Sequence, residues 1–181
     1  MDSIEIKVYS LSLTTEALHQ TLLAALNGPV HASTDAKRKP LILDCNLPLP
    51  PRTRCYVYNL VAGGPQRPNE FKAVLRVPGQ PSGHYGSFDE SDGRLVLVLA
   101  YHSALAVWVL WDSSQHPRFK NGGNIQVSRS AVYEAAASGW SAKSRRISGG
   151  RQELVIACQT PQLADAICKR LLTTGADHAS G

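Results

Sequence analysis

Two dense apolar runs, residues 94–101 and 105–111, constrain the fold of this chain more than any other feature. They are rich in Val, Leu and Trp, and only His102, Ser103 and Ala104 separate them. Short apolar runs without polar alternation are typical of β-strands that are covered on both faces. A three-residue connection favours their pairing as a hairpin. We therefore expect a central antiparallel pair with other elements packed on either side of it.

The rest of the chain predicts further strands and about three helices, which makes the fold class α+β. Further strands are expected at residues 3–13, 41–43, 56–61, 71–77, 125–127, 142–147 and 153–158. Helices are expected after the capping residues Thr14 or Thr15, after Ser128 or Ser130, and after Thr160-Pro161. Runs 56–61 and 71–77 are hairpin-like, and runs 142–147 and 153–158 are expected to pair across a Gly-Gly turn.

The predicted architecture is a mainly antiparallel twisted sheet or a partly open barrel. It contains about six to eight strands. The length of 181 residues suits one domain, expected at 1–173, with a small polar tail at 174–181 that is expected to be disordered. The loop at 31–40 is polar and basic and is expected to be exposed. The loop at 78–93 is rich in Gly, Pro, Ser and Asp, which is typical of a functional or mobile loop.

The composition points to a cytoplasmic protein with an anionic partner. The formal net charge is +5 and the pI is about 9.2, which favours nucleic acid first. No apolar run reaches the length of about 18 residues that spans a bilayer, and the N-terminus has no signal-peptide core. The four cysteines show no C-x-x-C spacing and are expected to be reduced thiols. We expect no metal site and no cofactor.

The stretch 52–76 joins two apolar runs through a Gly-Gly-Pro turn and carries several cations. Its candidate DNA-binding residues are Arg52, Arg54, Arg67 and Lys72. Arginine forks form paired hydrogen bonds to phosphate oxygens, and glycine lets backbone N–H groups approach them closely. The simpler interpretation of this stretch is a hairpin loop with solvated arginines.

The segment 111–128 is the best candidate for reading bases. It follows a buried strand and mixes cations and aromatic rings with amide and hydroxyl side chains. Its candidate DNA-binding residues are His116, Arg118, Phe119, Lys120, Asn124, Gln126 and Ser128, and Trp111 and Asp112 are assigned to a base-contacting loop. Asn and Gln pair with adenine, and rings stack on exposed bases. The alternative is a polar loop that satisfies its own backbone.

Two further segments carry candidate residues. The hairpin 143–151 is cationic through Lys143, Arg145, Arg146 and Arg151, which suits either a phosphate-contacting ribbon or a solvated edge strand. His84 and Tyr85 lie in the glycine-rich loop and are candidates for stacking on a flipped base. The run Lys37-Arg38-Lys39 is interpreted as a solvated loop.

Two other functions remain open. Metal-dependent nucleases of the PD-(D/E)xK type hold Mg²⁺ between an Asp and an E-x-K triplet on adjacent strands, and Asp44, Glu70 and Lys72 provide such a set. The prolines between Asp44 and Glu70 argue against this set. A protein-interaction or regulatory module is the third option, which would involve the acidic segment 89–92.

The chain resembles a bacterial family in the order of five segments within residues 54–172. They are YVYNLVAGGPQRPNEFKAVL, RLVLVLAY, AVWVLWDSSQHPRF, NIQVS and, after an amphipathic helix, ELVIAC. The family is the N-terminal DNA-recognition domain of restriction-endonuclease-like proteins from phage-defence loci. The resemblance implies a domain that reads DNA, plain or modified, and delivers it to a nuclease. No H-N-H or H-K-D motif occurs here, so we expect a reader that acts alone or with a separate nuclease subunit.

The sequence therefore favours a non-catalytic module that binds double-stranded DNA in a restriction or phage-defence system. Cationic loops would position the phosphates, and the segment 112–128 would meet the bases, modified or not.

Overall fold

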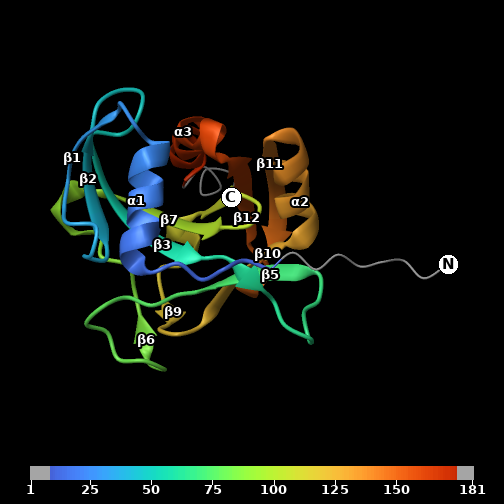
Figure 1. Ribbon diagram of the computed structural model, residues 1–181. Helices are drawn as coiled ribbons and strands as arrows, with labels where there is room; N and C mark the ends of the chain where they lie inside the picture. Colours follow the sequence, from blue (N-terminus) through green and yellow to red (C-terminus); the bar gives the residue numbers. More distant parts are fainter. Residues whose placement is uncertain (1–8, 175–181) are drawn as a thin grey trace.

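The expected hairpin of apolar strands lies inside a seven-stranded sheet in the computed structural model, which describes residues 9–174 (Figure 1). In spatial order its strands are β1 (Val30–Ser33), β2 (Leu41–Cys45), β3 (Arg52–Asn59), β7 (Leu95–His102), β8 (Val107–Trp111), β12 (Gln152–Gln159) and β11 (Trp140–Arg146). Only β3 and β7 pair in parallel, and every other neighbouring pair is antiparallel. The central strands β3, β7 and β8 are mostly buried, which was expected for β7 and β8.

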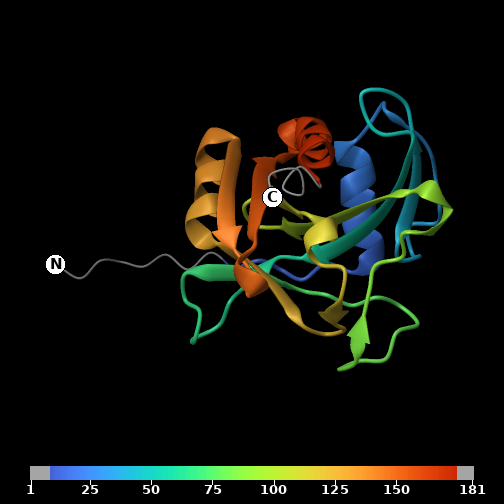
Figure 2. The same ribbon diagram turned by 180° about the vertical axis from the view of Figure 1, so that it is seen from behind.

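Both faces of the central strands are covered because their apolar side chains point alternately to two separate clusters. Cys55 and Val57 of β3 belong to one cluster, which packs against α1 (Thr15–Ala25) and α3 (Leu163–Thr173). Tyr56 and Tyr58 belong to the other cluster, which packs against α2 (Arg129–Ser138) and the small sheets. Figures 1 and 2 show α1 and α3 above the central strands β3 and β7, with β5, β6, β9 and β10 below them.

Two smaller sheets complete the strand content. Their strands are β10 (Asn124–Ser128), β5 (Glu70–Val74) and β4 (Val61–Ala62) in one sheet, and β6 (Tyr85–Gly86) and β9 (Phe119–Lys120) in the other. Short 3₁₀ turns lie at Ser91–Gly93, Ser113–Gln115, Ser148–Gly150 and Thr160–Gln162. The expected pairing of runs 56–61 and 71–77 is confirmed only at Val61, which lies opposite Lys72 in the β4–β5 pair. Residues 56–59 belong to β3 in the large sheet and do not pair with β5. The burial of β5 alternates and therefore suits an outer sheet, whereas β3 is buried on both faces.

The helix boundaries follow the capping signals in the sequence. The side chain of Thr14 accepts a hydrogen bond from the N–H of Ala17, and the side chain of Ser128 accepts one from Ala131. Gly139 ends α2 with φ of 89°, a left-handed conformation that glycine adopts without the clash of a Cβ atom. The α+β class with three helices and a mostly antiparallel open sheet is confirmed.

Residues 9–14 differ from the predicted strand, and both ends of the chain extend beyond the described residues. Residues 3–8 and 175–181 lie outside the described residues, so the tail at 174–181 stays a prediction for all but Thr174. Residues 9–14 form no strand, and their backbone instead pairs with side chains. The N–H and carbonyl groups of Leu13 bond to Asn59, and the N–H of Leu11 bonds to Ser103.

Candidate nucleic-acid interface

Three segments that lie far apart in the sequence meet around one surface pocket of about 360 Å³. They are the β4–β5 loop, the stretch from the end of β8 to β10, and the β11–β12 hairpin. Six lining residues carry a charge, a ring or an amide: Arg67, His116, Asn124, Gln126, Arg145 and Arg146. We call this site the arginine pocket. All six residues were predicted from the sequence as DNA contacts, and their contact with DNA stays a prediction.

Glu153 holds the base of the arginine pocket together. Its side chain is fully buried, opposite Arg145 in the β11–β12 register. One carboxylate oxygen accepts bonds from Nε2 of His116 at 2.8 Å and from the N–H of Asp112 at 3.1 Å. The other accepts from Nε of Arg145 at 2.7 Å and lies 2.5 Å from Nη2. The buried carboxylate therefore fixes the positions of two lining residues, His116 and Arg145.

The protonation of Glu153 follows from these partners. Burial disfavours the charged carboxylate and acts to raise its pKa. The hydrogen bonds and positive charges of His116 and Arg145 outweigh that effect, so the pKa of Glu153 lies below its ordinary value. Glu153 is consequently an anion at neutral pH, and it balances part of the positive charge behind the pocket.

The backbone carbonyl of Gln126 links the pocket to the core. It accepts a hydrogen bond from Nη1 of Arg145 at 2.7 Å and another from the indole Nε1 of Trp111 at 2.9 Å. Trp111 is 1% exposed, so its indole is a fixed anchor within the core. The position of Arg145 is thus set from two sides, by the carbonyl of Gln126 and by the carboxylate of Glu153.

The other two arginines are less restrained. Arg67 is exposed and forms an ion pair with Glu70 at 3.1 Å. Arg146 is exposed and forms no ion pair with any residue in the range 9–174. Alternation along β11 would put Arg145 and Arg146 on opposite faces. Arg146 ends the strand where the chain enters the hairpin turn, so both side chains line the pocket.

The pocket continues onto the outer face of the small sheet. Asn124, Gln126 and Ser128 alternate outward along β10, and Lys72 lies directly opposite Gln126 on β5. Asn124 and Gln126 therefore present their amides beside the arginines, with a further cation on the neighbouring strand. Ser128 has another role, because its hydroxyl caps α2.

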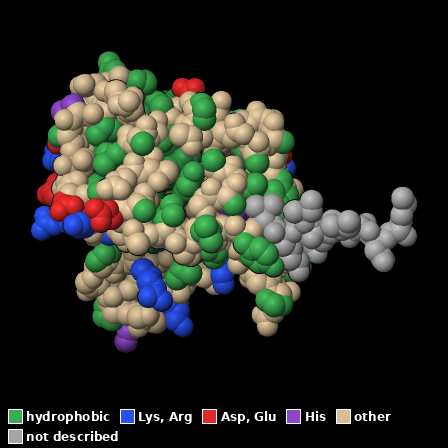
Figure 3. All heavy atoms as spheres, in the orientation of Figure 1, with side chains coloured by type: hydrophobic (Ala, Val, Ile, Leu, Met, Phe, Trp, Pro, Cys, Tyr) green, Lys and Arg blue, Asp and Glu red, His purple; other side chains and the backbone are tan. Residues whose placement is uncertain are grey.

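A second group of predicted residues lies apart from the arginine pocket. The guanidinium of Arg118 stacks over the ring of Tyr85 at 4.5 Å, beside a hollow of about 270 Å³. Lys120 pairs with Tyr85 in the β6–β9 register and is exposed, as is His84. In Figure 3, Lys and Arg side chains gather in the lower part of the molecule, whereas the surface over the helices shows mainly hydrophobic and neutral groups.

Four predicted contact residues are buried and have structural partners instead. The guanidinium of Arg54 ties down the 78–93 loop through the carbonyl of Asp89 at 2.6 Å and its carboxylate at 2.9 Å. The buried residues are Arg54, Trp111, Asp112 and Phe119. Contact with DNA requires exposed side chains. These four are buried, so the prediction that they contact DNA is wrong.

Three more predicted residues lie outside the pocket lining. The ammonium group of Lys143 forms an ion pair with Glu134 of α2 at 2.5 Å. Arg52 is exposed at the start of β3, and Arg151 is exposed between the hairpin turn and the start of β12. These cations add to the surface charge without sharing the pocket.

The residues of the nuclease alternative do not come together. Asp44 is opposite Arg52 at the start of β3 and forms an ion pair with Arg94 at 2.8 Å. Lys72 is opposite Val61, which follows the far end of β3. An eight-residue strand separates these two ends by roughly 25 Å. Within residues 9–174, no group of three or more His, Cys, Asp or Glu side chains is arranged to hold a metal ion.

The environments of Glu153 and Lys39 were not recognised at the sequence level. Glu153 is an acid at the start of an apolar run, and its position opposite Arg145 across the Gly-Gly turn was a usable signal. Lys39 was assigned to a solvated loop, yet its amine is buried against the ring of Tyr58. Its neighbours Lys37 and Arg38 are exposed, and nothing in the local sequence distinguishes Lys39 from them.

Comparison with known proteins identifies a family but no individual relative. No curated protein and no solved structure matches the chain. No helix within residues 9–174 is long and apolar enough to cross a bilayer. The sequence profile of the Methylase-associated X1 (MTaX1) family matches residues 51–167, which is more than half of the chain. Its domains are found with DNA methylases of restriction–modification-like systems. The chain therefore belongs to the Methylase-associated X1 family.

Proposed function

We propose that this chain binds double-stranded DNA, without cutting it, as a recognition module of a restriction–modification or phage-defence system. The observation that carries the proposal is the arginine pocket, where three cationic segments meet beside outward-facing amides. The methylase-associated family supports the biological context. The formal net charge of +5 supports an anionic partner.

The pocket has the size and chemistry of a phosphate-binding site at the edge of a DNA interface. Its volume of about 360 Å³ is too small for a duplex but accommodates one backbone phosphate. Arg145 is held rigidly by Glu153, so it loses little conformational entropy on binding. Arg146 and Arg67 lie at the same pocket with freer guanidinium groups, each suited to a paired hydrogen bond with phosphate.

Base reading is assigned to the amides beside these arginines. Asn124 and Gln126 face outward from β10, and such side chains make paired hydrogen bonds with adenine in the major groove. A phosphate fixed by the arginines would set the register of the duplex against these amides. The binding experiment compares the affinity of the chain for duplexes with and without methylated adenine or cytosine.

The test is an anisotropy titration of labelled duplex DNA at about 50 and about 200 mM salt. The double variant Arg67→Gln/Arg146→Gln is expected to weaken binding about 10-fold or more at low salt, because two phosphate contacts are lost. The slope of log affinity against log salt should fall by about 2. Absence of binding to every duplex at low salt would overturn the proposal.

The matched control is Lys37→Gln/Arg38→Gln, which removes the same charge from exposed residues outside the pocket. An equal loss in this control would show that affinity follows net charge, and the pocket would then have no special role. A plasmid-nicking assay with Mg²⁺ tests the nuclease alternative, for which the separation of Asp44 from Lys72 gives no support. A pull-down from cell extract addresses a separate nuclease or methylase subunit as partner.

A further inference from the structure

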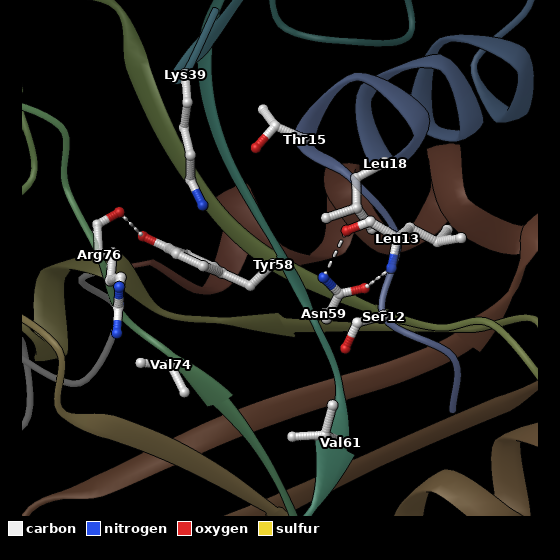
Figure 4. Close-up of a pocket in the computed structure, with 10 residues that line it drawn as sticks. All are labelled: Ser12, Leu13, Thr15, Leu18, Lys39, Tyr58, Asn59, Val61, Val74 and Arg76. Carbon is white, nitrogen blue, oxygen red and sulfur yellow. Dashed lines mark hydrogen bonds between the residues drawn. The ribbon is translucent and has the colours of Figure 1, made fainter. Parts of the chain in front are cut away.

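A second pocket, distinct from the arginine pocket, lies between the start of α1, the end of β3 and β5. Its volume is about 340 Å³, at the lower end of the range for small-molecule sites. Figure 4 shows Lys39 entering from one side, with its amine above the ring of Tyr58, and Thr15 of α1 across the space. We call this site the Lys39 pocket.

The amine of Lys39 is the central polar group of this pocket. Its Nζ donates a hydrogen bond to the carbonyl of Val57 at 2.9 Å and lies 3.6 Å from the centre of the Tyr58 ring. Within residues 9–174 it forms no ion pair with a carboxylate. An ammonium group has three N–H donors, so two remain for other acceptors. Burial without a counter-ion lowers the pKa of Lys39 to about 7.

The rest of the lining is either cationic, neutral polar or apolar. Among the described residues, Arg76 is the other charged lining residue, and no acidic side chain lines the pocket. The first residue of α1, Thr15, is also in the wall, and the N-terminal end of a helix carries partial positive charge. Val61 and Val74 form an apolar side that Figure 4 shows opposite Lys39. Lys39, Arg76 and the helix end therefore make the pocket electropositive, and Val61 and Val74 give it an apolar wall.

We propose that the Lys39 pocket binds a small organic anion, whose carboxylate or phosphate group meets the Lys39 amine while its compact apolar body lies against Val61 and Val74. The anion supplies the counter-charge that Lys39 lacks within the described chain. The hydroxyl of Tyr58 donates to the carbonyl of Arg76 at 3.2 Å, which fixes the ring beneath the Lys39 amine. This site does not depend on DNA binding at the arginine pocket.

The experiment is an NMR titration of the ¹⁵N-labelled chain with phenyl phosphate and with benzoate, which share an apolar ring but differ in the anionic group. Benzyl alcohol is the neutral probe with the same ring, and inorganic phosphate is the anion without it. We expect one or both aromatic anions to shift the amide signals of Tyr58, Asn59 and Val74, and benzyl alcohol to shift them far less. Equal shifts with benzyl alcohol, or none with any anion, would overturn the proposal.

Variants locate the anionic group. Lys39→Met is expected to weaken binding of the aromatic anion about 10-fold or more, because it removes a charge-assisted hydrogen bond. The matched control Lys37→Met changes an exposed lysine of the same loop and should leave the affinity unchanged. Unchanged affinity in Lys39→Met, or an equal loss in both variants, would contradict the proposed role of Lys39.

A second measurement keeps the proposal testable if Lys39→Met does not fold. The ¹³Cε signal of Lys39 reports its protonation in the unaltered chain. A bound anion stabilises the charged form, so saturation with phenyl phosphate or benzoate should raise the Lys39 pKa by about one unit or more. A Lys39 pKa that stays the same at saturation would show that the anion binds elsewhere.

Discussion

The two pockets present positive charge in opposite ways. In the arginine pocket the cations lie near the surface, and the innermost of them is paired with the fully buried Glu153. In the Lys39 pocket a single amine is buried with no carboxylate partner in the described chain. The first arrangement keeps its arginines charged and ready for a polyanion. The second leaves a charge to be neutralised, either by loss of a proton or by a small anion.

The two pockets also differ in their relation to the family match. All six residues that define the arginine pocket lie within residues 51–167. The Lys39 pocket combines residues inside that range, such as Tyr58, with Lys39 and Thr15, which lie before it. Both pockets nevertheless use the outer face of the same small sheet. Val61 and Gln126 lie on either side of Lys72 in the register, so about 10 Å separates the two walls.

The largest expected effect concerns the buried carboxylate of the arginine pocket. Glu153→Gln should destabilise the fold by about 3 kcal/mol, because Arg145 and His116 lose the anion that compensates their burial. Urea unfolding monitored by tryptophan fluorescence measures this. The control Glu134→Gln removes an exposed partner of Lys143 and should leave the unfolding midpoint unchanged. A loss below about 1 kcal/mol in Glu153→Gln would mean that the pocket is not organised by this charge.

The substitution Lys39→Met is expected to have a smaller effect on the free energy of unfolding, and this effect should be stabilising. The pKa of Lys39 is about 7 in the folded chain, whereas an unperturbed lysine, as in the unfolded chain, has a pKa of 10.5. Between these two pH values the unfolded chain binds more protons than the folded chain, so the stability of the fold rises with pH. Lys39→Met should therefore be more stable than the unaltered chain by about 1 kcal/mol near pH 7. The difference should shrink toward about pH 8.5, as measured by urea unfolding at several pH values.

The upper limit of that pH window is set by two buried thiols. Burial raises the pKa of Cys55 and of Cys158 to about 12, so ionisation of the unfolded thiols lowers stability above about pH 8.5. Comparing the two chains at each pH cancels this contribution. A constant difference between Lys39→Met and the unaltered chain from pH 7 to about 8.5 would show that Lys39 does not change protonation there.

The smallest expected effect concerns the cations outside both pockets. Arg118→Ala/Lys120→Ala removes two exposed cations next to Tyr85, and we expect the affinity of this double variant for DNA to fall only about 2- to 3-fold in total by general electrostatics. The anisotropy titration of the unaltered chain is the reference. A loss as large as that of Arg67→Gln/Arg146→Gln would extend the DNA interface to the β6–β9 sheet and weaken the contrast between pocket and periphery.

Local sequence signals predicted most of the elements because those elements depend on neighbouring residues. Thr14 and Ser128 cap their helices, Gly139 ends α2, and the β11–β12 hairpin turns at its glycines. The pairing of strands was less accessible. The long connection between β3 and β5 did not fix their pairing, and burial on both faces placed β3 between β2 and β7 instead.

The candidate site was predictable in its residue types but not in its grouping. The sequence identified the six lining residues of the arginine pocket that carry a charge, a ring or an amide, since such side chains are typical of DNA contacts. It also included Arg54 and Phe119, which the structure buries. Loop composition does not reveal whether a long side chain turns toward solvent or toward the core, because that depends on distant elements such as the 78–93 loop that covers Arg54.

The sequence by itself determined the α+β class, the capped helices, the apolar central strands and the cationic character of the surface, because each follows from local pattern or composition. Only the tertiary structure decided which charges share a pocket and which are buried. Arg67, Gln126 and Arg145 meet because the small sheet packs beside the β11–β12 hairpin. Lys39 differs from Lys37 because α1 and β3 enclose its amine, and the free energy of a charge depends on the atoms that surround it.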